Sequence, residues 1–290
     1  SPAGQNYESN SSDARDNITL LAVGQLWPMR TWNSILERAL YQAEKLHGFE
    51  EKAPDSLKII RSEADLDLVL DARTEGSGMI GGLLGIEGAH PLEGKLENLD
   101  KLEAAGYRLI GLQHFFDNAL GGSLHGTGNH GLTDFGREVV AEVARRGMII
   151  DVAHSSPQVV RDVLDMTDVP IVLSHSGIHS HCPVKRNLSD ELMQGIAATG
   201  GVIGMGYWAE VACNEITPAG IAKMITAAVA AVGADHVSLG SDFDGSVETA
   251  FDTSELPALT HELLAAGLSQ EVIAKVMGGN LIRVLRARLD

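Results

Sequence analysis

The stretch RRGMIIDVAHSSP, residues 145–157, decides how the fold of this 290-residue chain is interpreted. A glycine ends an amphipathic segment, the apolar run Met148–Val152 follows, and His154 stands just after the run. Near-continuous apolar runs of this length are typical of strands that are buried on both faces, as in a parallel sheet. The stretch therefore predicts a helix, a buried strand with a polar residue near its carboxyl end, and a further helix that begins at Pro157.

The same alternation recurs on both sides of this stretch. Five further apolar runs predict strands, at Met79–Ile86, Tyr107–Leu112, Pro170–Leu173, Gly201–Met205 and His236–Gly240. Amphipathic patterns predict helices at Leu96–Ala105, Thr133–Arg146, Pro157–Met166, Ser189–Thr199, Pro218–Val232 and Ser254–Ala266. Ser189 and Ser254 stand at N-cap positions, and Gly106, Gly147 and Gly200 stand where glycines that end helices are favoured.

Strict alternation of strands and helices predicts parallel strands with right-handed crossovers, in an α/β barrel or a doubly wound sheet. Charged or imidazole side chains follow several different strands, which is how a (β/α)8 TIM-like barrel builds its site. No GxGxxG turn opens a helix, so we favour the barrel. Six strands fall short of eight, and Ile18–Leu26 fits either a strand or a helical turn. We expect residues 1–290 to form one barrel domain whose first one or two strands lie before Ser1.

The composition excludes several classes of protein. Hydrophobic residues make up 44% of the chain and charged residues 21%, which are ordinary values for a globular protein. A formal net charge of −17 argues against nucleic acid as a partner, because phosphate binding needs a cationic surface. No apolar stretch reaches 18 residues, so the sequence predicts no transmembrane segment.

Polar residues that follow separate strands make up the candidate site. They are Glu87 in GIEGAH, His114 in LQHFFDN, His154 in IIDVAHSS, His175 in VLSHSG, Arg186 in VKRN and Asp242 in GSDFDG. Imidazoles and a carboxylate suit zinc, and a carboxylate can bridge two metals that share a hydroxide. A single histidine of this kind is more often a satisfied buried group than a ligand. Several polar residues that each end an apolar strand favour function, because isolated polar burial would be costly.

With these motifs in view, the chain resembles the membrane (renal) dipeptidases, zinc metallopeptidases with an amidohydrolase-like barrel. The resemblance runs from about Trp32 to Leu289 and rests on the order of several short motifs. These are GIEGAH, LQHFFDN, GLTDFGREVV, IIDVAHSS, VLSHSG, RNLSD, GSDFDG and GGNLIRV. Each motif is short, but their order and spacing together make the resemblance specific.

The resemblance implies a dipeptidase with two zinc ions per chain, in which a metal-bridging hydroxide attacks the peptide bond. Glu87 would bridge the two metals, and His154 and His175 would complete the ligands of one of them. It also implies tolerance of a D-residue at the second position of the substrate, and a possible homodimer.

Three further residues would handle the dipeptide, and the residue chemistry agrees with the roles that the resemblance implies. His114 would polarise the scissile carbonyl and donate a hydrogen bond to the oxyanion. Arg186 would bind the free carboxylate of the dipeptide through its fork of N–H groups. Asp242 would bind the substrate amino group or pass a proton to the leaving amine.

One departure from the family concerns the second metal. The family carries an H-x-D pair on its first strand, where residues i and i+2 share a face and bind the other zinc. This sequence has no H-x-D before Glu87, which agrees with strands missing from its start and puts that metal site in doubt. Two alternatives therefore stay open: a related amidohydrolase acting on a cyclic amide or lactam, and an inactive barrel that lacks one metal site.

Cys182 and Cys213 are the only cysteines of the chain. They resemble a pair that is bridged in mammalian relatives. A disulfide would place the protein in the periplasm or at the cell surface, whereas free thiols would indicate the cytoplasm.

Two loops could border the substrate. The segment Gly121–Gly131 follows a strand that carries a site residue, and it is either a lid, with His125 or His130 touching the substrate, or a solvated loop. Tyr207 and Trp208 follow another strand and could wall the pocket or serve as plain packing.

Overall fold

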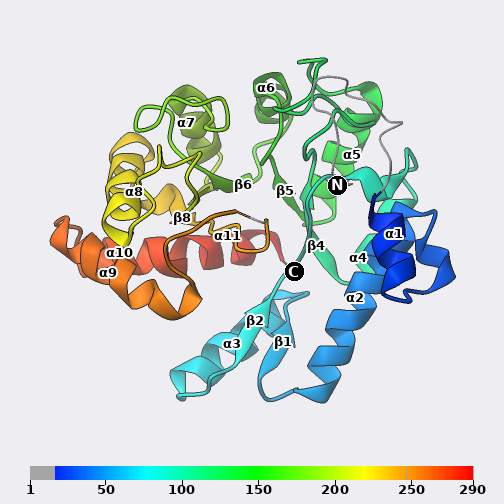
Figure 1. Ribbon diagram of the computed structural model, residues 1–290, viewed down its shortest axis with the longest axis horizontal. Helices are drawn as coiled ribbons and strands as arrows, with labels where there is room; N and C mark the ends of the chain where they lie inside the picture. Colours follow the sequence, from blue (N-terminus) through cyan, green and yellow to red (C-terminus); the bar gives the residue numbers. More distant parts are fainter. Residues whose placement is uncertain (1–16, 246, 290) are drawn as a thin grey trace. The chain divides into compact units, whose positions relative to one another are not determined.

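The computed structural model describes residues 17–245 and 247–289, which divide into two compact units. Unit 1 contains residues 17–150, 154–159 and 288–289, and unit 2 contains residues 151–153 and 160–287. In Figure 1, unit 1 runs mainly from blue to green, and unit 2 runs mainly from green to red.

Unit 1 combines parallel strand pairs with helices. Strand β1 (Leu57–Ile59) pairs with β2 (Ile80–Gly82), and β3 (Leu84–Ile86) pairs with β4 (Tyr107–Gly111). The helices of this unit are α1 (Asn17–Gly24), α2 (Ile35–Lys52), α3 (Glu63–Thr74), α4 (Asn98–Ala104) and α5 (Asp134–Arg145). Strand β5 (Ile149–Asp151) and helix α6 (Pro157–Met166) each begin in unit 1 and end in unit 2.

Local sequence explains where the helices of unit 1 begin. The side chain of Ser34 accepts a hydrogen bond from the backbone of Glu37 at the start of α2, and Thr133 accepts one from Gly136 at the start of α5. Such N-caps satisfy backbone N–H groups that have no partner inside the helix. Helix α5 then buries an apolar stripe of valines, so the side facing solvent is left to its charged residues.

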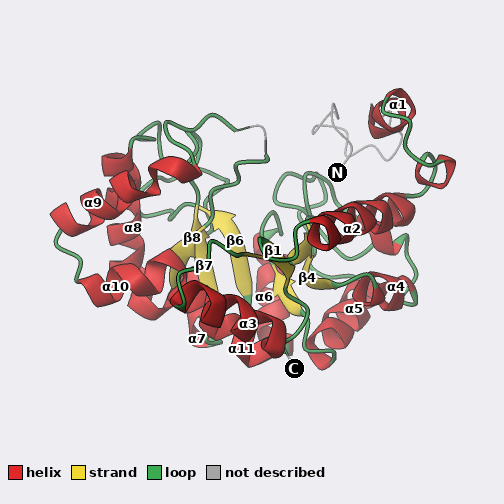
Figure 2. Ribbon diagram, turned by 90° about the horizontal axis from the view of Figure 1, so that it is seen from below, coloured by secondary structure: helices red, strands yellow, loops and turns green. Residues whose placement is uncertain are grey.

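Unit 2 carries three consecutive parallel strands in the order β6 (Val172–Ser176), β7 (Val202–Met205) and β8 (Val237–Leu239). Figure 2 shows these strands side by side, with helices of the same unit outside them. The helices are α7 (Asp190–Ala198), α8 (Pro218–Val232), α9 (Leu256–Ala265), α10 (Gln270–Ala274) and α11 (Asn280–Arg288). Every residue of β7 is buried, as expected of a central parallel strand covered on both faces.

The predicted α/β class with parallel strands is confirmed, and each of the six apolar runs overlaps a strand. The run Pro170–Leu173 covers only the start of β6, which continues to Ser176. The first run is broken in two, because β2 pairs with β1 while β3 pairs with β4. The ambiguous segment Ile18–Leu26 is largely helical, within α1. The predicted bounds of α6 and α8 agree with the structure.

The predicted caps give a mixed result. Ser189 caps α7, and Gly106, Gly147 and Gly200 adopt φ angles of +96°, +72° and +78° after their helices, as predicted. The prediction for Ser254 is wrong. Asp252 is the capping residue there, because its carboxylate accepts the N–H of the residue at 254 and starts a short 3₁₀ turn before α9.

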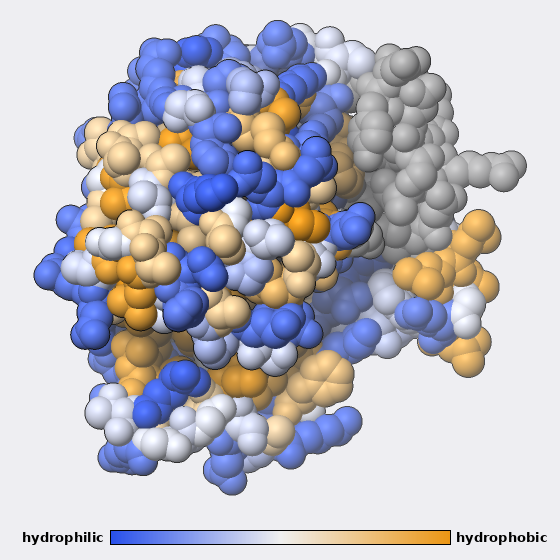
Figure 3. Space-filling view, turned by 60° about the vertical axis from the view of Figure 1, so that its left-hand side comes forward, coloured by the Kyte–Doolittle hydropathy of each residue, from blue (hydrophilic) through white to orange (hydrophobic). Residues whose placement is uncertain are grey.

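Within the described ranges, none of the helices is both long enough and apolar enough to cross a membrane. On the face of the molecule drawn in Figure 3, hydrophilic and apolar side chains are interspersed. Single exposed apolar residues are normal on protein surfaces, so this face alone indicates no particular partner.

Candidate active site

The turn after β3 brings Glu87 beside His114. Gly88 follows Glu87 with a φ angle of +81°, a conformation that favours glycine. A Cβ atom at Gly88 would lie 2.7 Å from Nδ1 of His90 and 3.0 Å from Cβ of His114. Glycine lets the backbone pass this close to the imidazole of His90 and to Cβ of His114, so the Glu-Gly pair in GIEGAH has a physical reason.

Three predicted site residues meet in unit 1: the predicted metal ligands Glu87 and His154, and the predicted substrate group His114. Nε2 of His154 lies 3.1 Å from Oε1 of Glu87, and Nε2 of His114 lies 3.5 Å from Oε2 of the same carboxylate. One potential ligand atom from each of the three residues lies within 4.8 Å of the other two. A carboxylate with two imidazoles is a donor set that fits zinc or a similar divalent metal. The donor chemistry of these three residues therefore fits a divalent metal, although the sequence prediction gave His114 a role toward the substrate and not toward the metal.

The three residues differ in access to solvent. The side chain of Glu87 is 44% exposed, whereas those of His114 and His154 are 14% and 5% exposed. His154 is also a non-glycine residue with a φ angle of +59°, in the left-handed region. Backbone conformations of this kind cost energy and cluster at functional sites.

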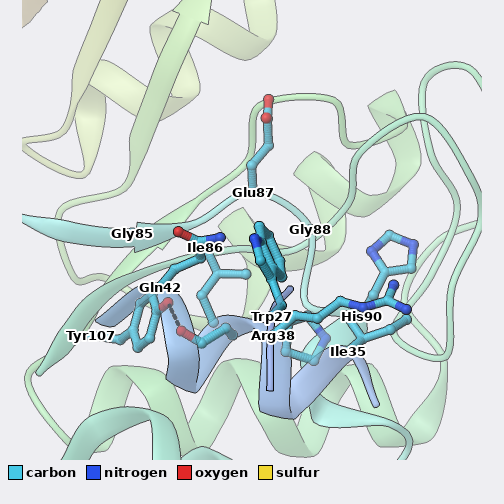
Figure 4. A pocket seen from close by; sticks show the side chains of 12 residues that line it. Trp27, Ile35, Arg38, Gln42, Gly85, Ile86, Glu87, Gly88, His90 and Tyr107 are labelled. Carbon is cyan, nitrogen blue, oxygen red and sulfur yellow. Dashed lines mark hydrogen bonds between the residues drawn. The ribbon is translucent and has the colours of Figure 1, made fainter. Parts of the chain in front are cut away.

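A cavity of about 300 Å³ lies next to this cluster in unit 1. Trp27, Ile35 and Tyr107 give it apolar walls, and Arg38 and Gln42 add polar groups. Figure 4 shows these side chains around the cavity, while the carboxylate of Glu87 points away from them. The cavity and the ligand cluster therefore lie on different sides of the Glu87 backbone.

Two groups near Glu87 have shifted pKa values. Burial lowers the pKa of His90 to about 4, so this imidazole is neutral near pH 7. Burial raises the pKa of Glu93, but hydrogen bonds from Ser34 and from the backbone of Leu36 and Ile35 outweigh it, and the net shift is downward. Through these bonds, Glu93 fastens the segment after Glu87 to the start of α2.

The other predicted residues lie in unit 2, where His175 and Arg186 are close together. Both side chains are buried, and Nη2 of Arg186 donates a 3.0 Å hydrogen bond to the carbonyl oxygen of His175. The guanidinium carbon lies 5.4 Å from the ring centroid of Trp208, and the imidazole of His175 lies 5.9 Å from it. Trp208 is buried and packs against both, so it holds the arginine by a cation–π contact.

Two cross-links hold the loops around Arg186. Cys182 and Cys213 form a disulfide, so the implied bridge is present. The buried amide of Asn187 makes a second link, because its Nδ2 donates to the carbonyl oxygens of Cys182 and Val211, at 2.9 Å each. Asn187 stands directly after Arg186 in the RNLSD motif, but no pattern in the sequence predicted this role for it.

Asp242 follows β8 with a φ angle of +55°, again in the left-handed region. The N–H of Gly245 donates to the carbonyl oxygen of Asp242 at 2.9 Å and closes a tight turn. A Cβ atom at Gly245 would collide with the carboxylate of Asp242. The GSDFDG motif therefore gives this carboxylate a defined position within unit 2.

A parallel α/β fold with imidazoles and carboxylates after its strands is the arrangement of metal-dependent hydrolases on TIM-like barrels. The comparisons with known proteins name the family. Residues 15–289 match the family described as membrane dipeptidase, peptidase family M19. The chain belongs to this family, as its motifs predicted.

Relatives of known name agree with the family match. Dipeptidase aclJ from Aspergillus oryzae is 33% identical over 264 residues, which is 87% of this chain but 61% of that protein. The chain thus spans about three fifths of the length of that relative. Among solved structures, the M19 metallopeptidase dipeptidase AC superposes with a TM-score of 0.77 at 26% identity, over 85% of this chain and 74% of the other.

A second solved structure is informative because of its ligand. It is a metallopeptidase from Rhodobacter sphaeroides, with a phosphinate mimic of the dipeptide L-Ala-D-Ala bound. Its TM-score is 0.74 at 26% identity, and the match covers 85% of this chain and 73% of that one.

Proposed function

We propose that this protein is a metal-dependent dipeptidase that cleaves the peptide bond of free dipeptides. The observation that carries the proposal is the carboxylate–imidazole cluster of Glu87, His114 and His154, in a chain that belongs to the membrane dipeptidase family. An enzyme that grips both charged ends of its substrate should reject longer or blocked peptides, because one grip would then be lost.

Glu87, His154 and His175 are the proposed metal ligands, and zinc is the proposed metal. When bound, zinc would lower the pKa of a bound water and so supply a hydroxide nucleophile near neutral pH. The 44% exposure of the Glu87 side chain supports a bridging role, because a metal can reach the carboxylate from solvent. The absence of an H-x-D pair before Glu87 makes the number of metals bound by this chain a decisive measurement.

Three residues are the proposed substrate groups. The ring of His114 would donate a hydrogen bond to the oxyanion that forms when the carbonyl is attacked. Arg186 would bind the substrate carboxylate, and its contact with Trp208 keeps the guanidinium oriented before substrate arrives. Asp242 would bind the substrate amino group and pass a proton to the leaving amine.

The proposed substrates include dipeptides with a D-residue at the second position. The related structure from Rhodobacter sphaeroides supports this, since its ligand mimics L-Ala-D-Ala. The disulfide between Cys182 and Cys213 further favours an oxidising compartment such as the periplasm or the cell exterior.

The test combines metal analysis with a substrate series. The purified chain is dialysed against zinc and then buffer, its metal content is measured by mass spectrometry, and hydrolysis of L-Ala-L-Ala and L-Ala-D-Ala is followed. N-acetylated and C-amidated forms of the same dipeptides serve as matched controls. We expect at least one tightly bound zinc, turnover of both free dipeptides, and little turnover of either blocked form.

Two results would contradict the proposal. Rapid cleavage of a blocked tetrapeptide would show that the termini are not gripped. A chain that binds zinc but cleaves only a cyclic amide would favour the amidohydrolase alternative instead.

A further inference from the structure

His125 contacts the proposed metal ligand His154 on the side opposite to Glu87. Nε2 of His154 lies 3.1 Å from Glu87, and its Nδ1 lies 3.1 Å from Nε2 of His125. Both ring nitrogens of His154 thus have a defined neighbour, one toward the proposed metal and one away from it.

We propose that His125 is a positioning residue that fixes the ring orientation and the tautomer of His154 for metal binding. A histidine that binds metal through one nitrogen usually donates its other N–H to a carboxylate, a carbonyl or water. With Nε2 of His154 directed at the metal, its Nδ1 carries the proton and donates to Nε2 of His125. The proton of His125 then resides on its own Nδ1. This inference rests on the proposed function, because it assumes that His154 is a ligand.

The loop that carries His125 is fastened to the backbone of His154. Ser123 and Ser155 form an antiparallel bridge, and the N–H of Leu124 donates to the carbonyl oxygen of His154 at 2.7 Å. The hydroxyl of Ser123 also donates to the carbonyl oxygen of His114. The segment up to His125 is therefore held by the same backbone that presents the ligands, and it is not a free lid.

Asp117 closes the same loop from inside. Its carboxylate accepts the N–H of Ser123 at 2.7 Å and the N–H of Gly128 at 2.8 Å, on either side of His125 in the sequence. A Cβ atom at Gly126 would overlap this carboxylate, so the loop needs glycine there. The conformation of the loop thus sets where the imidazole of His125 can lie.

Phe115 restricts both imidazoles. Its ring centroid lies 5.3 Å from that of His125 and 5.4 Å from that of His154, with T-shaped geometry in both contacts. An apolar ring at this position excludes water from one side of the pair. A hydrogen bond is stronger where the local dielectric constant is low, so Phe115 reinforces the contact between the two imidazoles.

The contact between His125 and His154 depends on the hydrogen-bonding chemistry of the side chain at position 125 as well as on its position. Imidazole can accept a hydrogen bond at one nitrogen while the other carries the proton, so it can partner either tautomer of His154. A glutamine amide can also either accept or donate, whereas a leucine side chain of similar size can do neither. These two replacements therefore separate the hydrogen bond from the packing.

The experiment compares His125→Leu and His125→Gln with His130→Leu, which alters an exposed histidine of the same loop. Zinc affinity is measured by competition with a chromophoric chelator, and ring protonation by ¹H–¹⁵N NMR of the zinc-loaded wild type. We expect His125→Leu to bind zinc about 10- to 100-fold more weakly, which is the usual effect of losing such a partner. His125→Gln should recover most of that loss, and His130→Leu should match the wild type. The proton of His154 should lie on Nδ1.

Equal zinc affinity in His125→Leu and the wild type would overturn the inference, as would a proton on Nε2 of His154 or a wild type that binds no zinc. Failure of the proposed function looks different. A wild type that binds zinc but hydrolyses no dipeptide would reject the dipeptidase assignment, while the affinity series would still decide the role of His125.

Discussion

The cluster of Glu87, His114 and His154 in unit 1 and the loops around Arg186 in unit 2 are held in place by different kinds of interaction. In unit 1, Glu87 and His154 are positioned by a glycine turn, a left-handed backbone and hydrogen bonds. In unit 2, the loop that contains Arg186 and the loop that contains Trp208 are joined by a disulfide and by the buried amide of Asn187.

The difference follows from what each region has to do. A metal ligand must stay accessible so that an ion can enter, and the Glu87 carboxylate is 44% exposed. A buried cation differs, because taking a charge out of water is costly unless its partners and hydrogen bonds are held in good geometry. The Arg186 side chain is buried, and its frame carries a covalent cross-link. The exposed carboxylate of Glu87 is thus held without a covalent link, whereas the segments around the buried charge of Arg186 are cross-linked.

The largest expected effect on activity comes from a substitution of Glu87, the exposed carboxylate of unit 1. Glu87→Gln keeps the shape of the side chain but removes the charge that a bridging ligand needs. We expect kcat/KM for L-Ala-L-Ala to fall at least about 1,000-fold, since metal chemistry contributes several kcal/mol of transition-state stabilisation. Zinc content measured in parallel should fall as well. Glu97→Gln, at an exposed carboxylate ten residues along, is the matched control, and an equal loss there would contradict the assignment.

Breaking the covalent frame of unit 2 tests stability. The disulfide joins residues 31 positions apart, and a loop of this length predicts a loss of about 3–4 kcal/mol in the free energy of unfolding on reduction. Urea unfolding of the wild type and of Cys213→Ser, with and without reductant, measures this. The variant should show no response to reductant. A wild type whose unfolding midpoint is insensitive to reductant would mean that the bridge does not stabilise this unit.

Because of the hydrogen bonds made by the Asn187 amide, we expect catalysis to change little when the disulfide is reduced. Because Asn187 still links the segments of Cys182 and Val211, we expect KM to change less than about threefold on reduction at 25 °C. Asn187→Ala should make KM sensitive to reductant. If reduction alone raises KM strongly, the amide does not hold the loops by itself.

Substitution of the cation itself should have a smaller effect on activity than Glu87→Gln. Arg186→Lys retains a charge but loses the planar fork, so we expect KM for free dipeptides to rise about 10- to 100-fold with a smaller change in kcat. Hydrolysis of a dipeptide amide, slow from the start, should be nearly unaffected by the change. Lys185→Ala, at an exposed neighbouring cation, is the control. Equal losses on the free and the amidated dipeptide would show that Arg186 does not bind the carboxylate.

Part of the site could be predicted from the sequence because its polar residues follow the carboxyl ends of parallel strands. Glu87, His114 and His154 each follow a different apolar run, and the parallel strands bring their ligand atoms together in unit 1. His125 was singled out only as a loop residue. Its contact with His154 spans 29 positions and depends on hydrogen bonds that close the loop, and no local pattern encodes such a contact. The role of Asn187 was not predicted for the same reason, since its hydrogen-bond acceptors, Cys182 and Val211, are not adjacent to it in the sequence.

The elements missed in unit 1 have local causes. Strand β1 is three residues long, too short for a periodic signal. Helix α3 contains the run Asp65-Leu66-Asp67-Leu68, whose alternation has the period of a strand, although a serine N-cap fixes the helix. The pattern of apolar residues therefore predicted the buried strands better than the half-exposed helices that flank them.

The smallest expected effect lies in the ion pairs of unit 1 and concerns pH. Arg146 contacts Asp100, Glu103 and Glu142 at 2.6–2.7 Å. Hydrogen bonds from Arg145 and Arg146 lower the pKa of Glu142 to about 2, from an ordinary value of 4.5. A carboxylate with a lowered pKa adds stability above its ordinary pKa, and this contribution disappears as the pH falls from about 4.5 toward 2.

Glu142→Gln should therefore cost little, under about 1 kcal/mol, because exposed ion pairs contribute weakly. The difference in Tm between this variant and the wild type should be greatest at neutral pH and shrink toward pH 2, with reductant having no influence on it. Glu138→Gln, on the exposed side of the same helix, is the control. A Tm difference that stays constant down to pH 2 would mean that the charge of Glu142 does not contribute to the stability of the protein.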